Sequence, residues 1–315
     1  MTLTQLSAFV LVARLGSVKA AADALSVSEP AVSQAIAALR KYLDDPLLVR
    51  GGTGMEMTAG GGRLLAIAAQ MVSLGAEAAS AVRAANGSPE QLRLVAPAPV
   101  VEFVVAPLAD AFSARSAGQI EVSAGVAATD EMGVLVSQRL ADVALGPDLS
   151  GDPSLGLISQ PIFRCRMVVL GAPGTRFRGA PSQWPWLVEP SALDPGSEVS
   201  RLLRGLGVPE SRLKVFPNQT AAWEAAVRGA GVAPGLTHLA VHQMRRRELV
   251  AIDIPGTPQD VVWHVTTLST DRRSAAAGSM RHFLSTPQAM KLLREPGSGV
   301  PPSRFRPPVY VTIWS

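Results

Sequence analysis

Three short helical patterns at the N-terminus constrain the fold of this chain most strongly. Apolar residues recur at helical spacing over residues 4–15 and again over residues 18–25. A third pattern runs over residues 28–43, with Ser28 placed to cap it and Pro30 in its first turn, where the missing N–H costs nothing. Two short helices, a tight connection and a third helix that begins with polar residues predict a helix-turn-helix.

Helical spacing alone would fit a three-helix fragment of an enzyme equally well, and the particular residues decide between the two. The stretch SVKAAADALSVSEPAVSQAIAALRKYLDDPLLVR, residues 17–50, resembles the DNA-binding signature of the LysR-type transcriptional regulators. The family's signature has paired alanines, a hydroxyl-Gln-Pro-Ala-hydrophobic-Ser start to the recognition helix and a Pro-Leu-Phe-x-Arg wing. The matching positions are Ala21, Ala22, Leu25, Val27, Ser28, Pro30, Ala31, Val32, Ser33, Ile36, Leu39, Leu43, Pro46, Leu47 and Arg50.

This resemblance implies that the helix beginning at Ser28 lies in the major groove of DNA. Ser33 and Gln34 would then face base edges, where glutamine can hold adenine. Ser28 and Arg50 would bond to phosphates, which fix register without reading sequence. The alternative for Ser33 and Gln34 is an ordinary solvated helix face. Glu29 stands where the family usually has glutamine, so it would either accept from a cytosine amino group or repel phosphate.

The charge of the N-terminal part is low for a DNA-binding module. Residues 1–86 carry seven basic and six acidic side chains, a net charge of +1, within a chain whose net charge is +4. We therefore expect modest non-specific affinity and a shallow salt dependence. Arg40 and Lys41, near the end of the third helix, either add phosphate contacts or only complement the helix dipole.

A long proline-free run over residues 59–86 follows. Leu64, Ile67, Met71 and Leu74 alternate at spacings of three and four residues, the rhythm of a helix that buries a narrow stripe against another helix. The resemblance implies that this helix pairs two subunits, and the alternative is packing within one chain. Pairing two recognition helices predicts a homodimer on an inverted-repeat operator in double-stranded DNA, and the family often forms homotetramers.

The remaining chain alternates strand-like and helical runs separated by Pro and Gly, which predicts an α/β domain. The resemblance, which covers about residues 2–295, implies a two-lobed fold like that of periplasmic binding proteins. We predict a winged helix-turn-helix over residues 1–58, a linker helix over 59–87 and an effector-binding domain over 88–295. Lobe I would comprise about 91–160 and 262–295, and lobe II about 161–261. Residues 296–315 are expected to be a disordered tail, with an edge strand at 309–314 as the alternative.

The family's ligand cleft maps onto segments at the ends of predicted strands. We predict a small-molecule effector with substantial apolar area, held by Val100, Thr129, Ser197 and Thr220. Two prolines before Val100 remove N–H donors from that side, and Glu102 would oppose an anion and could receive a cation. The alternative for each of the three hydroxyls is a helix cap.

The cysteine and a pair of histidines give little indication of a redox or metal site. One cysteine, Cys165, excludes a disulfide scaffold, and we expect it to be buried in a strand rather than to act as a redox switch. His238 and His242 have the spacing of a metal-binding pair on a helix, but no third ligand follows at useful spacing, so we predict two surface side chains.

Several classes of protein are disfavoured. No apolar run of about 18 residues could cross a membrane, and the N-terminus lacks the pattern of a secretory signal. A solute-binding component of a transporter would be exported and would have no helix-turn-helix. The sequence has no nucleophile elbow, P-loop or dinucleotide fingerprint, so we expect neither an enzyme nor a cofactor. The chain is expected to be a cytoplasmic DNA-binding regulator.

Overall fold

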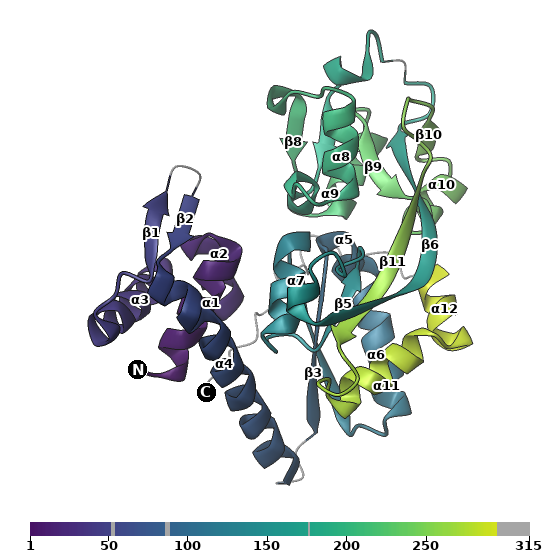
Figure 1. The fold of residues 1–315 in the computed structure, drawn as a ribbon. Coiled ribbons are helices and arrows are strands. Elements are labelled where there is room, and N and C mark those ends of the chain that lie inside the picture. The colour runs from purple at the N-terminus through teal and green to yellow at the C-terminus, as the bar shows by residue number, and fades with distance from the viewer. Residues whose placement is uncertain (52–53, 86–88, 176, 295–315) are drawn as a thin grey trace.

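The computed structural model describes residues 1–51, 54–85, 89–175 and 177–294 (Figure 1). A helical N-terminal unit is followed by one long helix and then by a larger α/β domain. The expected tail over residues 296–315 lies outside the described residues, as does its alternative strand at 309–314. Among the described helices, none is both long and apolar enough to cross a bilayer.

The N-terminal unit has the three predicted helices and a small hairpin. Its elements are α1 (Leu3–Leu15), α2 (Val18–Leu25), α3 (Glu29–Leu43), β1 (Leu48–Gly51) and β2 (Gly54–Met57). Ser28 caps α3 as expected, since its hydroxyl accepts from the Ala31 N–H at 3.4 Å. Phe9 and Leu39 are fully buried where α1 and α3 meet, so the apolar stripes of the sequence form one core. β1 and β2 pair antiparallel as the wing.

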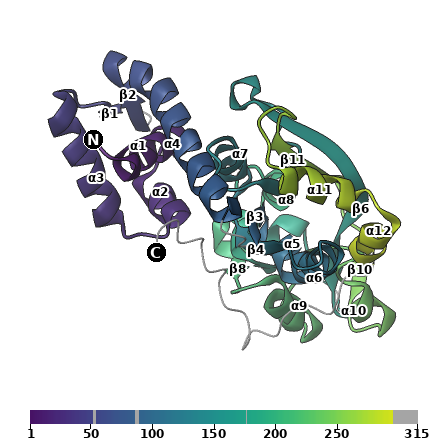
Figure 2. The same cartoon turned by 90° about the horizontal axis from the view of Figure 1, so that it is seen from below.

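The long helix α4 (Ala59–Ala85) uses one face for its own N-terminal unit. Ala68 and Val72 are buried in the same core as α1 and α3, and the helix extends along that unit in Figure 2. Arg139, at the end of α7 in the α/β domain, pairs with Glu77 of α4 at 2.7 Å and donates to the Ser73 hydroxyl at 2.6 Å. These contacts join α4 to the α/β domain.

The α/β domain is built on a mixed sheet in the order β10-β6-β11-β5-β3-β4, with β9 paired to β6, and on a separate β7-β8 pair. Its strands are β3 (Glu90–Ala96), β4 (Ile120–Val126), β5 (Val143–Gly146), β6 (Leu157–Gly171), β7 (Trp186–Val188), β8 (Leu213–Val215), β9 (Ala233–Leu236), β10 (Val250–Ile252) and β11 (Gln259–Leu268). Its helices are α5 (Ala98–Val100), the π-helical η1 (Val101–Val105), α6 (Ala106–Arg115), α7 (Thr129–Ser137), α8 (Glu198–Gly205), α9 (Gln219–Val227), α10 (Val241–Arg245), α11 (Ala275–Leu284) and α12 (Pro287–Arg294). Short 3₁₀ turns are η2 (Pro153–Leu155), η3 (Pro181–Gln183), η4 (Pro190–Leu193) and η5 (Glu210–Arg212).

The domain has two lobes. The first lobe contains β3, β4 and β5 with α5, η1, α6, α7, α11 and α12, and the second contains β7 to β10 with α8, α9 and α10 (Figure 1). β6 and β11 run antiparallel through both lobes and are the two chain crossings between them. The register of this pair shifts between Trp263 and His264, opposite Pro161, so a bulge lies at the crossing.

Two elements differ from the sequence expectation. β6 is 15 residues long, whereas its continuous apolar run covers only residues 167–170. Pro161 and half-buried neighbours interrupt the apolar pattern in the first half of the strand, and the bulge accommodates that proline. The helical segment after β3 is not one regular helix but α5, η1 and α6 in sequence, with the π-helical turn at its centre. Such turns are rare and often occur at functional sites.

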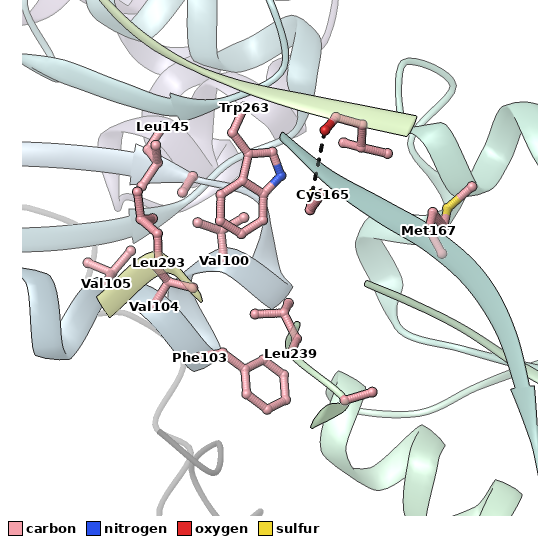
Figure 3. Close-up of a cluster of buried hydrophobic side chains, with 14 of the residues drawn as sticks. Val100, Phe103, Val104, Val105, Leu145, Cys165, Met167, Leu239, Trp263 and Leu293 are labelled. Carbon is pink, nitrogen blue, oxygen red and sulfur yellow. Dashed lines mark hydrogen bonds between the residues drawn. The ribbon is translucent and has the colours of Figure 1, made fainter. Parts of the chain in front are cut away.

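The core of the α/β domain runs through both lobes. Figure 3 shows Val100, Phe103, Leu239 and Trp263 converging near the crossing strands. Cys165 lies beside them, only 7% exposed, with its thiol 3.6 Å from the Val261 carbonyl oxygen. The predicted burial of Cys165 in a strand is confirmed, and this burial raises the pKa of its thiol to about 12.

Candidate functional site

The first turns of α3 present a polar face to solvent. Ser28, Glu29 and Pro30 are exposed, and so are Ser33 and Gln34 one turn further on. The apolar residues of the same helix face the other way, into the core of the N-terminal unit. A helix anchored on one side and polar on the other can enter a DNA groove without losing its support.

The wing stands beside this helix, and Arg40 fixes it there. The Arg40 guanidinium is half-buried and donates through Nη2 to the Leu48 carbonyl oxygen at 2.7 Å, which joins α3 to β1. Leu48, where the family's wing has an aromatic residue, is itself buried. The backbone of Arg50 pairs with Met55 in the hairpin, and its side chain lies outside the described residues.

The predicted stripe of α4 is mostly uncovered in the single chain. Ile67, Met71 and Leu74 are 57%, 37% and 62% exposed. Leu64 is half-buried against the core of the N-terminal unit, and Val82 continues the exposed stripe. Large apolar side chains grouped along one helix face are typical of a surface that another chain covers.

A small cavity lies between the lobes, near the bulge of β6 and β11. Its volume is about 80 Å³, and Val100, Trp223, Leu239 and Trp263 are among its lining residues. Thr129, Ser197 and Thr220 are not among them. The structure thus brings only Val100, of the four predicted effector residues, to this cavity, whose wall is largely apolar.

Glu102, in the π-helical turn η1, reaches across to the second lobe. Its carboxylate accepts from the backbone N–H groups of Gln219 and Thr220, both at 3.0 Å, and from the Thr220 hydroxyl. These donors belong to the first turn of α9. Burial raises the pKa of Glu102, while the hydrogen bonds from Thr220 and Gln219 act in the opposite direction. The aromatic rings of Phe103 and Trp223 pack at 5.3 Å beside this contact.

A second carboxylate crosses between the lobes in the reverse direction. Asp194 accepts from the Thr129 N–H at 2.7 Å, at the start of α7, and from the Gly196 N–H at 2.9 Å. A Cβ at position 196 would lie 3.0 Å from the Thr129 Cβ, so glycine permits this close approach. Thr129 is the first residue of α7 and Ala128 is its cap. Ser197 caps α8 by accepting from the Ser200 N–H at 3.0 Å.

Sequence reasoning missed these crossings because they join distant residues. It identified Glu102 as a charge that would oppose an anion and could receive a cation, and it did not single out Asp194. Glu102 and Thr220 are 118 positions apart, and Asp194 and Thr129 are 65 apart. The only local signal was the position of Asp194 shortly before the cap of α8.

The predicted surface position is found for His242, which is exposed, but not for His238, which is half-buried. His238 precedes α10 and does not share a helix with His242. Its ring packs edge-on against Phe163 at 5.0 Å and Trp263 at 5.1 Å, beside the bulge of the crossing strands. Neither ring nitrogen has a hydrogen-bond partner among the described residues. Burial lowers the pKa of His238 to about 4, so the imidazole is neutral at physiological pH.

Comparison with known families identifies both parts of the chain. Residues 3–62 match the bacterial regulatory helix-turn-helix protein, lysR family, and residues 85–287 match the LysR substrate binding domain. The chain belongs to the LysR family. As a LysR-type protein it is a DNA-binding transcriptional regulator with an effector-binding domain.

Relatives of this LysR-type regulator span its whole length. An uncharacterized HTH-type transcriptional regulator, Rv0377 of Mycobacterium tuberculosis, is 34% identical over 100% of both chains. The regulator CfxR of Cupriavidus necator is 26% identical and covers 96% of this chain and 97% of its own.

Solved structures show the same fold at low identity. Full-length LysG of Corynebacterium glutamicum with bound effector Arg has a TM-score of 0.55 at 19% identity, covering 92% of this chain and 99% of its own. A full-length variant of AphB has a TM-score of 0.57 at 17% identity, covering 90% of this chain and 98% of its own. Two predictions about the fold are therefore confirmed. The N-terminus is a helix-turn-helix, and the C-terminal domain has two lobes.

Proposed function

We propose that this regulator binds an inverted-repeat operator as a homodimer and changes its subunit geometry when a small molecule binds between its lobes. In this proposal the winged helix-turn-helix, residues 1–58, binds the operator, and the linker helix, residues 59–87, pairs the subunits. The effector-binding domain, residues 88–295, divides into lobe I, about 91–160 and 262–295, and lobe II, about 161–261. Since the proposed operator is chromosomal DNA, the proposed site of action is the cytoplasm.

The exposed polar face of α3 carries the proposal for DNA. Ser33 and Gln34 project from the side opposite the buried stripe, where base edges would lie if the helix entered the major groove. Ser28 and Pro30 form the exposed start of α3, which would approach the DNA backbone, and Glu29 is exposed at the same helix start. Arg40 acts by holding the wing, which brings Arg50 to the neighbouring phosphates.

The uncovered stripe of α4 supports the homodimer. Ile67, Met71 and Leu74 would be buried against the same residues of a second copy in a two-fold contact, with Leu64 at its edge. Each fully buried aliphatic side chain contributes about 1.5–3 kcal/mol. A homotetramer would arise if two such dimers met through their effector-binding domains.

The cavity near Val100 supports binding of an effector. A ligand that enlarges or closes this space would favour one arrangement of the lobes through its differential affinity. Thr129 and Thr220 lie at the two carboxylate crossings, so opening of the lobes would free groups at both positions. Ser197 bonds within lobe II, where it caps α8.

A gel shift with the DNA upstream of the protein's own gene tests the proposal. Loss of a two-bond base contact costs about 1–3 kcal/mol, so Gln34→Ala should weaken operator binding about fivefold or more. Ser33→Ala removes a single hydroxyl and should weaken operator binding by a smaller factor. Matched exposed positions in the other domain, Gln288→Ala and Ser150→Ala, should bind as the wild type does. Unchanged binding by both α3 variants would refute the assignment of this helix to the groove.

A further inference from the structure

The start of α9 already holds an anion that belongs to the protein itself. Three donors point to one place, namely the N–H groups of Gln219 and Thr220 and the Thr220 hydroxyl, and all three bond to Glu102. α9 has nine residues, so its first turn carries the partial positive charge of a helix dipole. Glu102 therefore satisfies the groups that a ligand carboxylate would otherwise use.

Two buried neighbours act in opposite directions on an anion at this helix end, since Asn218 offers a donor and Glu189 is an acid. Asn218, which caps α9, is only 2% exposed, and its side-chain Nδ2 has no acceptor among the described residues, so an additional donor is buried at the same helix end. Glu189, 3% exposed, is close enough to Glu102 for the charge of Glu102 to help raise its pKa, after burial itself. A ligand carboxylate would have to displace Glu102 and then lie near these buried acids.

The second crossing has the same form. Asp194 supplies an acceptor to the Thr129 N–H at the start of α7, so the protein's own acids also serve the other helix end that faces between the lobes. Between the lobes lies the cavity of about 80 Å³. Its lining is mostly hydrocarbon and aromatic, and its polar side chains are Glu198, an acid, and Gln219, whose amide already donates to the Pro234 carbonyl oxygen.

We propose that Glu102 is a specificity determinant of the effector cleft: it fills the anion position at α9 with a carboxylate of the protein, so the cleft selects an uncharged, largely apolar effector and rejects carboxylates. This inference rests on the proposed effector function. Removal of the Glu102 carboxylate should convert the start of α9 into an anion site, because the donors would then lack an acceptor.

The test compares isobutyrate with isobutyramide, two small probes that share a branched carbon skeleton and differ in charge. Calorimetric titrations use the full chain at neutral pH as wild type, as Glu102→Ala and as the matched control Glu224→Ala, an exposed acid on the same helix. We expect Glu102→Ala to bind isobutyrate about tenfold or more tightly than the wild type does, since charged hydrogen bonds are the strong ones. Isobutyramide affinity should change much less, and Glu224→Ala should match the wild type.

Three results would overturn the role of Glu102: no gain of isobutyrate affinity, an equal gain for both probes, or an equal gain in Glu224→Ala. If Glu102→Ala does not fold, hydrogen exchange on the wild type decides. Amide exchange at Gln219 and Thr220 should be unaffected by isobutyrate, and slower exchange there would contradict the proposal. Operator binding is measured for the same proteins, so failure of the specificity proposal with DNA binding retained is distinct from failure of the wild type to bind DNA.

Discussion

His238 predicts a specific loss of stability in acid. The imidazole lies between Phe163 and Trp263 without a hydrogen-bond partner among the described residues, and its pKa is lowered from 6.5 to about 4 by burial. Between these values the unfolded chain binds a proton and the folded chain does not, so the free energy of unfolding falls as the pH falls. The stability that the neutral imidazole contributes is fully present well above pH 6.5 and is lost as the pH falls towards 4.

The size of the loss follows from the same pKa shift. Linkage gives about 1 kcal/mol at pH 5.5 and about 2 kcal/mol at pH 4.5, relative to neutral pH. His238→Phe keeps a ring between the two aromatic neighbours and removes the titration. The difference in unfolding free energy between wild type and His238→Phe should therefore shift by these amounts on acidification, whatever the carboxylates contribute to both proteins.

Urea unfolding followed by tryptophan fluorescence measures this difference. All five tryptophans lie at or beyond position 184, so the signal does not come from the helix-turn-helix. His242→Phe, the same substitution at an exposed position, is the matched control and should track the wild type at every pH. Parallel loss of stability by the wild type and His238→Phe between pH 7 and pH 4.5 would refute the neutral buried imidazole.

Two further predictions concern DNA binding and assembly. The net charge of +1 over residues 1–86 predicts a log-affinity against log-salt slope much shallower than about −10, and a slope that steep in a filter-binding or anisotropy series would contradict it. Ile67→Glu with Leu74→Glu should convert the dimer to a monomer in sedimentation, because each substitution places a charge in the proposed contact, while the exposed flank variant Ala66→Glu should leave the dimer intact.

The helical N-terminus was predictable because its determinants are local. Ser17 and Ser28 cap α2 and α3, and the apolar spacing of each helix marks the face that is buried. The exposed face of α3 then follows without knowledge of any other element. The predicted starts and ends of α1, α2 and α3 therefore agree with the structure to within a residue.

The cleft was much less predictable, because its contacts join residues far apart in the chain. The helix pattern around Glu102 does not reveal a π-helical turn, and nothing near Glu102 indicates that Gln219 and Thr220 would bond to it. Thr129, Ser197 and Thr220 were expected from resemblance to line a ligand site, yet Ser197 and Thr220 bond within the protein through their hydroxyls and Thr129 through its N–H. His238 was predicted to lie at the surface because its aromatic neighbours, which cover it, come from two strands distant in the sequence.

The two chain crossings between the lobes belong to one hydrogen-bonded ribbon, β6 with β11. Since neither strand can lengthen, the lobes cannot separate as independent bodies, and any relative movement is a bend or twist of this ribbon. The bulge at Trp263 and His264 interrupts the ladder and is the place where such bending meets least resistance. An effector that moves the lobes of this molecule would therefore act by changing how far this one ribbon is bent or twisted.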